Sequence, residues 1–160
     1  MDGPEENEGL YYARKLLDHT RHSVFLTGKA GTGKSTFLRD YAESTHKNFI
    51  ILAPTGIAAI NARGTTIHSF FQIPLGPIQP MDGRLNISRI KPYKKNIMKK
   101  LDLMIVDEVS MVRADLLDAM DHILRKVRRN PQPFGGVQLL LVGDLLQLEP
   151  VVKNDEWELL

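Results

Sequence analysis

The stretch SVFLTGKAGTGKSTFL, residues 23–38, decides the fold class. Its first part, Ser23–Thr27, is a short apolar run typical of a buried strand, and its last part continues as a helix with Phe37 and Leu38 on one side. Between them, GKAGTGKS matches the phosphate-loop pattern G-x-x-x-x-G-K-[ST], in the strand-then-helix context that the pattern requires. The stretch therefore predicts a P-loop nucleotide-binding fold.

Each residue type in this loop suits a particular step of phosphate or metal binding. Glycines let the backbone wind so that successive N–H groups point at phosphate oxygens, and the start of the helix adds the positive end of its dipole. Lys34 is expected to reach the β- and γ-phosphates, and the Ser35 hydroxyl to bind Mg²⁺. The predicted nucleotide-binding residues of the loop are Gly28, Lys29, Ala30, Gly31, Thr32, Gly33, Lys34, Ser35 and Thr36.

Further apolar runs alternate with helical patterns along the chain. Strands that are apolar throughout and alternate with helices indicate an α/β fold, in which a parallel sheet is covered by helices on both faces. In such sheets ligands bind beyond the carboxyl ends of the strands. Besides residues 23–27, strands are predicted at 49–53, 101–108 and 137–144, helices at 8–20, 34–44 and 115–129, and an insertion or long loop with four prolines at 72–100.

Two acids, Asp107 and Glu108, directly follow the third predicted strand. A Mg²⁺-bound triphosphate needs a carboxylate near the metal, and Asp107 is placed for that role. Hydrolysis also needs a group that takes a proton from the attacking water or orients it, which suits Glu108. Kinases and small GTPases usually lack the second acid, so the pair favours an ATPase. The alternative is a solvated pair of acids at a strand end.

The stretch LLLVGDLLQLEP, residues 139–150, places polar side chains at the end of the fourth predicted strand. Its apolar run predicts a strand buried on both faces, which would bring Gln147 to the same rim as Lys34 and Glu108. Asp144 is expected to anchor the turn or to join the water network of the site.

The composition fits a globular protein of one domain. The 160 residues are 42% hydrophobic and 25% charged, and the net charge of +2 does not by itself indicate nucleic-acid binding. Two basic clusters, residues 91–100 and 125–130, fit either a nucleic-acid surface or ordinary solvated segments. The chain has no cysteine, which excludes disulfides and thiolate metal sites. Without a long apolar run or a signal peptide, we expect an intracellular, soluble protein with no membrane partner.

Three blocks of the sequence resemble one family. They are residues 24–38, the segment APTGIAAINARGTTIHSFF at residues 53–71, and a long block from the Asp-Glu pair through PFGG to QLEPV. Together and in this order they are similar to the petite-integration-frequency (PIF) DNA helicases, in the RecD-like branch of superfamily I. The likeness covers about residues 22–73 and 101–152.

The resemblance implies a RecA-like motor domain that uses ATP and Mg²⁺ to move 5′ to 3′ along single-stranded DNA, with roles in DNA repair, recombination and telomere maintenance. Lys34 and Ser35 match the family's phosphate lysine and metal hydroxyl. Asp107 and Glu108 match the metal carboxylate and the catalytic glutamate. Gln147 matches the glutamine that contacts the γ-phosphate and couples hydrolysis to DNA.

The second block resembles the family's single-strand-contact segment, in which Thr55 and His68 match contact positions and Phe70 is a weaker candidate. Independently of the family, Pro54-Thr55-Gly56 would offer a hydroxyl and N–H groups to a DNA phosphate. Phe70 or Phe71 would stack on an unpaired base. The alternative is that both phenylalanines belong to the core and His68 is a buried histidine with its hydrogen bonds satisfied. For Phe71 we favour the core.

Two positions depart from the family's pattern. Glu149 stands where the family often has proline, a change that we expect to be local. The adenine base in this branch is commonly held by a glutamine or similar amide upstream of the phosphate loop. Asn7 is the only amide before the loop, so it is the predicted adenine contact. A preference for ATP over GTP therefore depends mainly on the likeness.

A superfamily I motor closes ATP between two RecA-like domains, and the second domain supplies arginines that are worth about 10³–10⁵ in rate in related enzymes. We expect residues 1–160 to be one such domain of a longer protein, because VVKNDEWELL at residues 151–160 ends in the middle of a pattern. The chain is predicted to be monomeric, to bind Mg·ATP or Mg·ADP, to hydrolyse ATP slowly and not to unwind DNA. The arginine that completes the site is not in this chain.

Two other interpretations stay open. An AAA+-type DNA-replication ATPase would share the phosphate loop and the Asp-Glu pair, although Gly-Asp-x-x-Gln and TIHSFF disfavour it. A nucleotide-gated binding module would bind ATP without useful turnover. The predicted location is the cytoplasm, at the nucleoid, in a bacterium, and the nucleus or mitochondria in a eukaryote.

Overall fold

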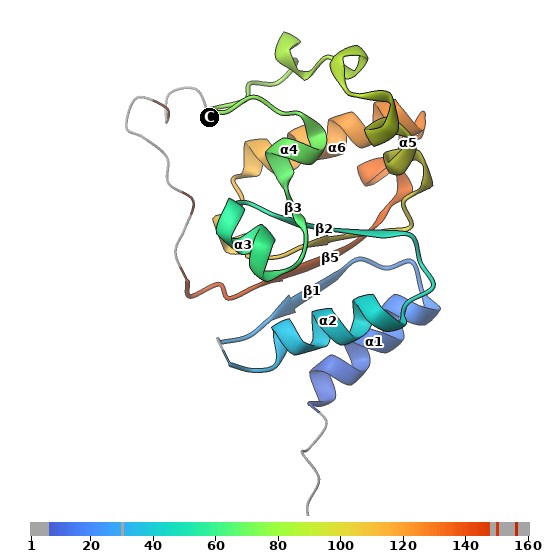
Figure 1. Cartoon of the computed structure of the whole chain (residues 1–160), viewed down its shortest axis with the longest axis vertical. Coiled ribbons are helices and arrows are strands. Elements are labelled where there is room, and N and C mark those ends of the chain that lie inside the picture. Colours follow the sequence, from blue (N-terminus) through green and yellow to red (C-terminus); the bar gives the residue numbers. More distant parts are fainter. Residues whose placement is uncertain (1–6, 30, 148–149, 151–155, 157–160) are drawn as a thin grey trace, which may run out of the picture.

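The fold is a five-stranded parallel sheet with helices on both faces (Figure 1). In a computed structural model, we describe residues 7–29, 31–147, 150 and 156. The strand order is β1-β5-β4-β2-β3, and every described pair is parallel. The predicted α/β class and parallel sheet are confirmed. The strands are β1 Val24–Thr27, β2 Phe49–Ala53, β3 Thr65–Thr66, β4 Leu103–Val106 and β5 Gln138–Gly143.

Strand β4 shows why the sheet is buried on both faces. Alternate side chains of a strand point to opposite faces. Leu103 and Ile105 enter one hydrophobic cluster, Met104 and Val106 enter the other, and all four are fully buried. Burying a side chain of this size stabilises the fold by about 1.5–3 kcal/mol. A continuous apolar run of this kind therefore marks a central strand.

Two helices, α1 Glu8–His19 and α2 Lys34–Ser44, cover the face that Leu103 and Ile105 point to (Figure 1). The other face is covered by α4 Ile67–Phe71, α5 Pro92–Lys100 and α6 Ala114–Arg128. No helix within the described ranges is long and apolar enough to cross a membrane.

Several short elements were not predicted from the sequence. Helix α3, Gly56–Asn61, follows β2, and β3 and α4 come next, so the segment after Ala53 is more regular than expected. Residues 72–100 include two 3₁₀ turns, Gly83–Leu85 and Ile87–Arg89, as well as α5. Two further 3₁₀ turns were also not predicted. Val109–Met111 follows β4, and Pro133–Gly136 precedes β5.

Helix α5 is part of the core although its sequence is mostly basic. Met98 is fully buried in the α6-side cluster. The Arg128 guanidinium donates hydrogen bonds to the carbonyl oxygens of Met98 at 2.7 Å and Leu101 at 3.1 Å. This arginine at the end of α6 satisfies carbonyl groups at the end of α5 that lack helical partners.

Candidate nucleotide-binding site

The phosphate loop joins β1 to α2, as the pattern predicts. Gly31 and Gly33 have φ angles of 83° and 89°, in the left-handed region that favours glycine. At Gly28 an added Cβ would lie 2.9 Å from the Thr32 hydroxyl oxygen, so a larger residue would displace that side chain. Ala30, also predicted to bind nucleotide, lies outside the described residues.

The Lys34 ammonium lies over the loop. It donates hydrogen bonds to the carbonyl oxygen of Gly28 and, at 3.0 Å, to that of Lys29. The Thr32 hydroxyl donates to the same Lys29 carbonyl at 2.7 Å. These contacts hold a positive charge at the concave side of the loop, where the loop pattern predicts that phosphate oxygens bind.

The two acids at the end of β4 are held by the backbone. The Asp107 N–H donates to the carbonyl oxygen of Leu52 at 2.8 Å, and the Asp107 carboxylate accepts the N–H of Glu108 at 2.9 Å. Glu108 has φ 51°, an uncommon conformation for a residue with a side chain. Burial raises the pKa of Asp107; burial, and then the charge of Asp107, raise the pKa of Glu108.

Asp144 anchors the turn after β5. Its carboxylate accepts the N–H of Leu146 at 2.9 Å, and its carbonyl oxygen accepts the N–H of Gln147 at 3.0 Å. The expected turn-anchoring role is confirmed. The Gln147 side chain is exposed and faces the same cavity as the phosphate loop.

One cavity of about 310 Å³ unites the predicted groups. Its lining comes from the carboxyl ends of β1, β4 and β5 and from the first turn of α2, as expected for a ligand site in a parallel sheet. The described lining residues are Gly31, Gly33, Lys34, Ser35, Thr36, Asp107, Glu108, Gly143, Asp144 and Gln147.

Asn7 has a structural role at the start of α1. Its side-chain oxygen accepts the N–H of Gly9 at 3.0 Å, which caps the helix. The first turn of α1 nevertheless lies beside the phosphate loop, because a Cβ on Gly33 would be 3.5 Å from a methyl group of Leu10. Asn7 is therefore near the loop, and a contact with adenine stays a prediction.

The predicted DNA-contact residues lie on the other half of the sheet edge. The Thr55 hydroxyl caps α3 by accepting the N–H of Ala58 at 3.2 Å. His68 lines a separate cavity of about 200 Å³ with Arg113. Burial, and then the charge of Arg113, lower the pKa of His68. Neither residue lines the cavity at the phosphate loop.

Phe70 is a weaker candidate for DNA contact in the sequence, but the structure buries its side chain. Its side chain is 4% exposed, and its ring meets that of Phe71 edge-on at 5.0 Å inside the core. A buried ring cannot stack on a DNA base without leaving the core, so this conformation does not support Phe70 as a DNA contact. Phe71 is 1% exposed, which confirms its assignment to the core.

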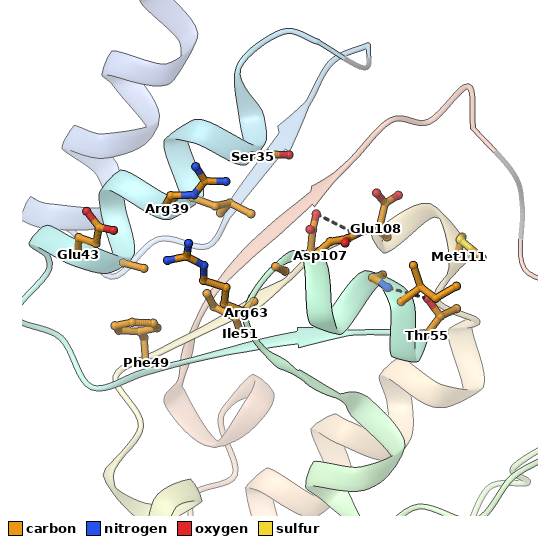
Figure 2. A pocket seen from close by; sticks show the side chains of 16 residues that line it. Ser35, Arg39, Glu43, Phe49, Ile51, Thr55, Arg63, Asp107, Glu108 and Met111 are labelled. Carbon is orange, nitrogen blue, oxygen red and sulfur yellow. Dashed lines mark hydrogen bonds between the residues drawn. The ribbon is translucent and has the colours of Figure 1, made fainter.

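A second cavity, of about 580 Å³, was missed by the sequence analysis (Figure 2). It lies between α2 and α3 and shares Ser35, Asp107 and Glu108 with the cavity at the phosphate loop. Arg39 and Arg63 also line it. No motif marks these arginines, because only the folded sheet brings the two segments together.

The fold and the cavity define the class of protein as a P-loop NTPase with a RecA-like parallel sheet. Residues 10–158 match the family model described as PIF1-like helicase. The chain therefore belongs to the PIF1-like helicase family. The match decides between the two ATPase interpretations, against the AAA+ type.

Individual relatives agree with the family match. The ATP-dependent DNA helicase PIF1 of Saccharomyces cerevisiae (strain YJM789) is 42% identical over 86% of this chain, which covers 16% of that protein. A crystal structure of Bacteroides Pif1 bound to single-stranded DNA is 49% identical over 95% of this chain, with a TM-score of 0.88. One of Bacteroides sp. Pif1 in complex with ADP-AlF4 has the same identity and coverage and a TM-score of 0.89. This chain covers 35% of each of the two crystallised chains.

Proposed function

We propose that the chain is the ATP-binding part of a DNA helicase that moves 5′ to 3′ on single-stranded DNA. The observation that carries the proposal is the shared cavity in which Lys34, Glu108 and Gln147 meet. Related proteins bind ADP-AlF4 and single-stranded DNA, which agrees with this function. Such a protein would work where DNA is, in the bacterial cytoplasm or in the nucleus or mitochondria of a eukaryote.

Each residue has a distinct part in the proposed reaction. The loop N–H groups and Lys34 hold the phosphates, and Gln147 contacts the γ-phosphate. Glu108 accepts the proton of the attacking water. The water oxygen bonds to the γ-phosphorus while the bond from that phosphorus to the β–γ bridging oxygen breaks, which leaves ADP and inorganic phosphate. The raised pKa of Glu108 brings it closer to the neutral range in which a general base is effective.

A Mg²⁺ ion fits the donors at the inner end of the cavity. Hydroxyl and carboxylate oxygens are ligands that Mg²⁺ takes, with nucleotide phosphates and water completing its shell. The Ser35 hydroxyl and the Asp107 carboxylate line the same cavity. We propose these two residues as the protein's metal contacts. When bound, the ion would neutralise charge on the phosphates.

The chain by itself is proposed to hydrolyse ATP slowly and not to unwind DNA. The described lining of the cavity contains one cation, Lys34, and no arginine. An arginine that stabilises the transition state would contribute about 10³–10⁵ in rate. Such a group would have to reach the cavity from outside this lining.

Single-stranded DNA is proposed to bind near the ends of β2 and β3, where Thr55 and His68 lie. Thr55 follows β2 and His68 follows β3, and these two strands are parallel neighbours, so one extended strand of DNA could contact both residues. The pKa of His68 is lowered, so its imidazole is neutral near pH 7 and would act as a hydrogen-bonding partner.

The experiment that tests the proposed function measures release of phosphate from Mg·ATP with and without single-stranded DNA. The wild-type chain and Glu108→Gln are compared, and nucleotide affinity is measured in the same samples. Slow release that Glu108→Gln abolishes supports the proposal. Tight nucleotide binding with negligible release in every sample would instead identify a nucleotide-gated binding module. Robust unwinding by the 160-residue chain would contradict the requirement for an added arginine.

A further inference from the structure

The second cavity opens directly behind the acids of the nucleotide site. It shares Ser35, Asp107 and Glu108 with the cavity at the phosphate loop, so the two spaces meet at these side chains. Its other walls are α2 and α3, and Figure 2 shows Arg39 and Glu43 on α2 and Thr55 on the opposite wall. A group released at the γ-phosphate position would therefore have a space to enter on the side away from the phosphate loop.

Two arginines line this cavity without a protein partner in the described ranges. Arg39 comes from α2 and Arg63 from the turn after α3, and both side chains extend into the same space (Figure 2). Neither guanidinium group makes a hydrogen bond or an ion pair with any described residue, although the Arg63 backbone N–H donates to the carbonyl oxygen of Ile60 at 3.1 Å. Arg63 has φ 55°, so its backbone adopts an uncommon conformation at the point where its side chain enters the cavity. Two like charges sharing one space repel unless an anion lies between them.

The apolar lining of the cavity strengthens the attraction for an anion. Leu38, Phe49 and Ile51 contribute apolar surface to the same cavity as the arginines. Charges interact more strongly beside such low-dielectric walls than in open water. Glu43 also lines the cavity but forms no ion pair with either arginine among the described residues. Asp107 and Glu108 make the inner end negative, so an anion is drawn from the acids toward the arginines.

We infer that this cavity is a second anion site, in which Arg39 and Arg63 bind the inorganic phosphate that hydrolysis produces. The inference rests on the proposed function, because that function supplies the phosphate. ADP and its metal would still occupy the loop side when the product forms, so the space behind Glu108 is the one open to it. Arginine suits the ligand because its planar fork of N–H groups matches phosphate oxygens.

A phosphate of single-stranded DNA is the competing occupant, because Thr55 lines the same cavity. The observations favour the free product. The carboxylates that define the inner end of the cavity belong to the site of hydrolysis, and a DNA backbone would bring a continuous chain of charges past them. The experiment distinguishes free inorganic phosphate from a phosphate of single-stranded DNA.

The experiment titrates inorganic phosphate into four forms of the 160-residue chain and follows binding by phosphorus NMR. The forms are the wild type, Lys34→Ala, the pair Arg39→Gln/Arg63→Gln, and all three changes together. Lys34 does not line the second cavity, and the two arginines do not line the first, so each change removes one site. Arg21→Gln, an exposed arginine between α1 and β1, is the matched control.

We expect the change at Lys34 and the changes at the two arginines to reduce phosphate binding independently of each other. Lys34→Ala keeps one phosphate site and binds ADP about 10–150-fold more weakly. The arginine pair keeps ADP binding, but its phosphate affinity measured with Mg·ADP present falls about tenfold or more, as for lost hydrogen bonds to a charged group. The triple variant binds no phosphate, and Arg21→Gln behaves as the wild type. In the wild type, the side-chain N–H signals of Arg39 and Arg63 shift as phosphate is added.

Two outcomes would overturn the inference. One is unchanged phosphate affinity in the arginine pair with Mg·ADP bound. The other is loss of oligo(dT) affinity in the arginine pair together with displacement of phosphate by oligo(dT) from Lys34→Ala, which would assign the arginines to the DNA path. If the wild type failed to bind ADP while Lys34→Ala still bound phosphate, the proposed function would fail and the anion site would stand.

Discussion

The sheet edge has two halves, and they use polar residues differently. At the ends of β1, β4 and β5, polar side chains face one cavity and the backbone holds them in place. At the ends of β2 and β3, the hydroxyls of Thr55 and Thr66 cap short helices, and Phe70 and Phe71 are core. An aromatic residue after a strand is therefore available to a ligand only when the core does not already bury it.

The largest expected effect is on hydrolysis. Glu108→Gln removes the general base while keeping the size of the side chain, so hydrolysis falls by about 10²–10⁴ in rate. Nucleotide affinity stays near the wild-type value. Phosphate release and fluorescent-ADP titration check both. Asp118→Asn, an exposed acid of α6, is the control. Hydrolysis at the wild-type rate in Glu108→Gln would show that Glu108 is not the general base, although it faces the cavity.

The core assignment of Phe70 predicts a large loss of stability. Phe70→Ala leaves a cavity and lowers the free energy of unfolding by about 3–5 kcal/mol, as measured by denaturant unfolding. Phe25→Ala is the matched control, because Phe25 is 47% exposed on β1 and its loss costs much less. A stable Phe70→Leu variant that lost single-stranded DNA binding would return Phe70 to the DNA site.

Lys34→Ala is expected to weaken binding of ADP by about 10–150-fold, through loss of charge-assisted hydrogen bonds to phosphate. Lys99→Ala is the control, because Lys99 is an exposed lysine of α5 and does not line the cavity. Titration of fluorescent ADP measures the affinity, and circular dichroism checks the fold, since Lys34 also binds two loop carbonyls. Equal losses in the two variants would contradict a specific role for Lys34.

Two variants separate the role of Thr55 as the cap of α3 from its proposed role as a DNA contact. Thr55→Ala removes the cap of α3 and lowers the free energy of unfolding by about 1 kcal/mol. Thr55→Asn keeps a capping oxygen and should recover most of that stability. If the hydroxyl also contacts DNA, affinity for oligo(dT) stays reduced in Thr55→Asn. Wild-type affinity in that variant would leave Thr55 with the cap alone.

The smallest expected effect is a shift in the pKa of Glu108. Burial and the charge of Asp107 raise the pKa of Glu108, so its carboxyl remains protonated to a higher pH than an exposed glutamate does. Asp107→Asn removes the second cause and should lower the pKa of Glu108, while the asparagine oxygen can still accept the Glu108 N–H. Carbon NMR of the carboxyl group measures the pKa. An unchanged pKa would show that the charge of Asp107 does not contribute to the shift.

Local sequence was enough to predict four of the five strands and most of the residues that line the cavity at the phosphate loop. The loop glycines, Lys34 and the strand-end acids are predictable because each depends on neighbours a few residues away in the chain. The topology of a parallel sheet then places all strand ends on one edge. Gln147 followed from the same rule, and its presence in the shared cavity agrees with it.

The segment after β2 was harder to predict because its patterns are short. Helix α3 has six residues and α4 has five, too few for a hydrophobic period to be distinctive. The aromatic pair at the end of α4 is compatible with stacking on DNA or with the core. Contact with side chains of α5 and α6, distant in sequence, decides for the core.

The sequence by itself determined that this protein has a P-loop, a buried parallel sheet and a set of acids and amides at its edge, because these depend on residue type and spacing. Only the tertiary structure decided that Phe70 is buried and that Arg39 and Arg63 share a cavity behind Glu108. Burial and the meeting of two like charges are properties of segments brought together by the fold, and spacing along the chain does not encode them.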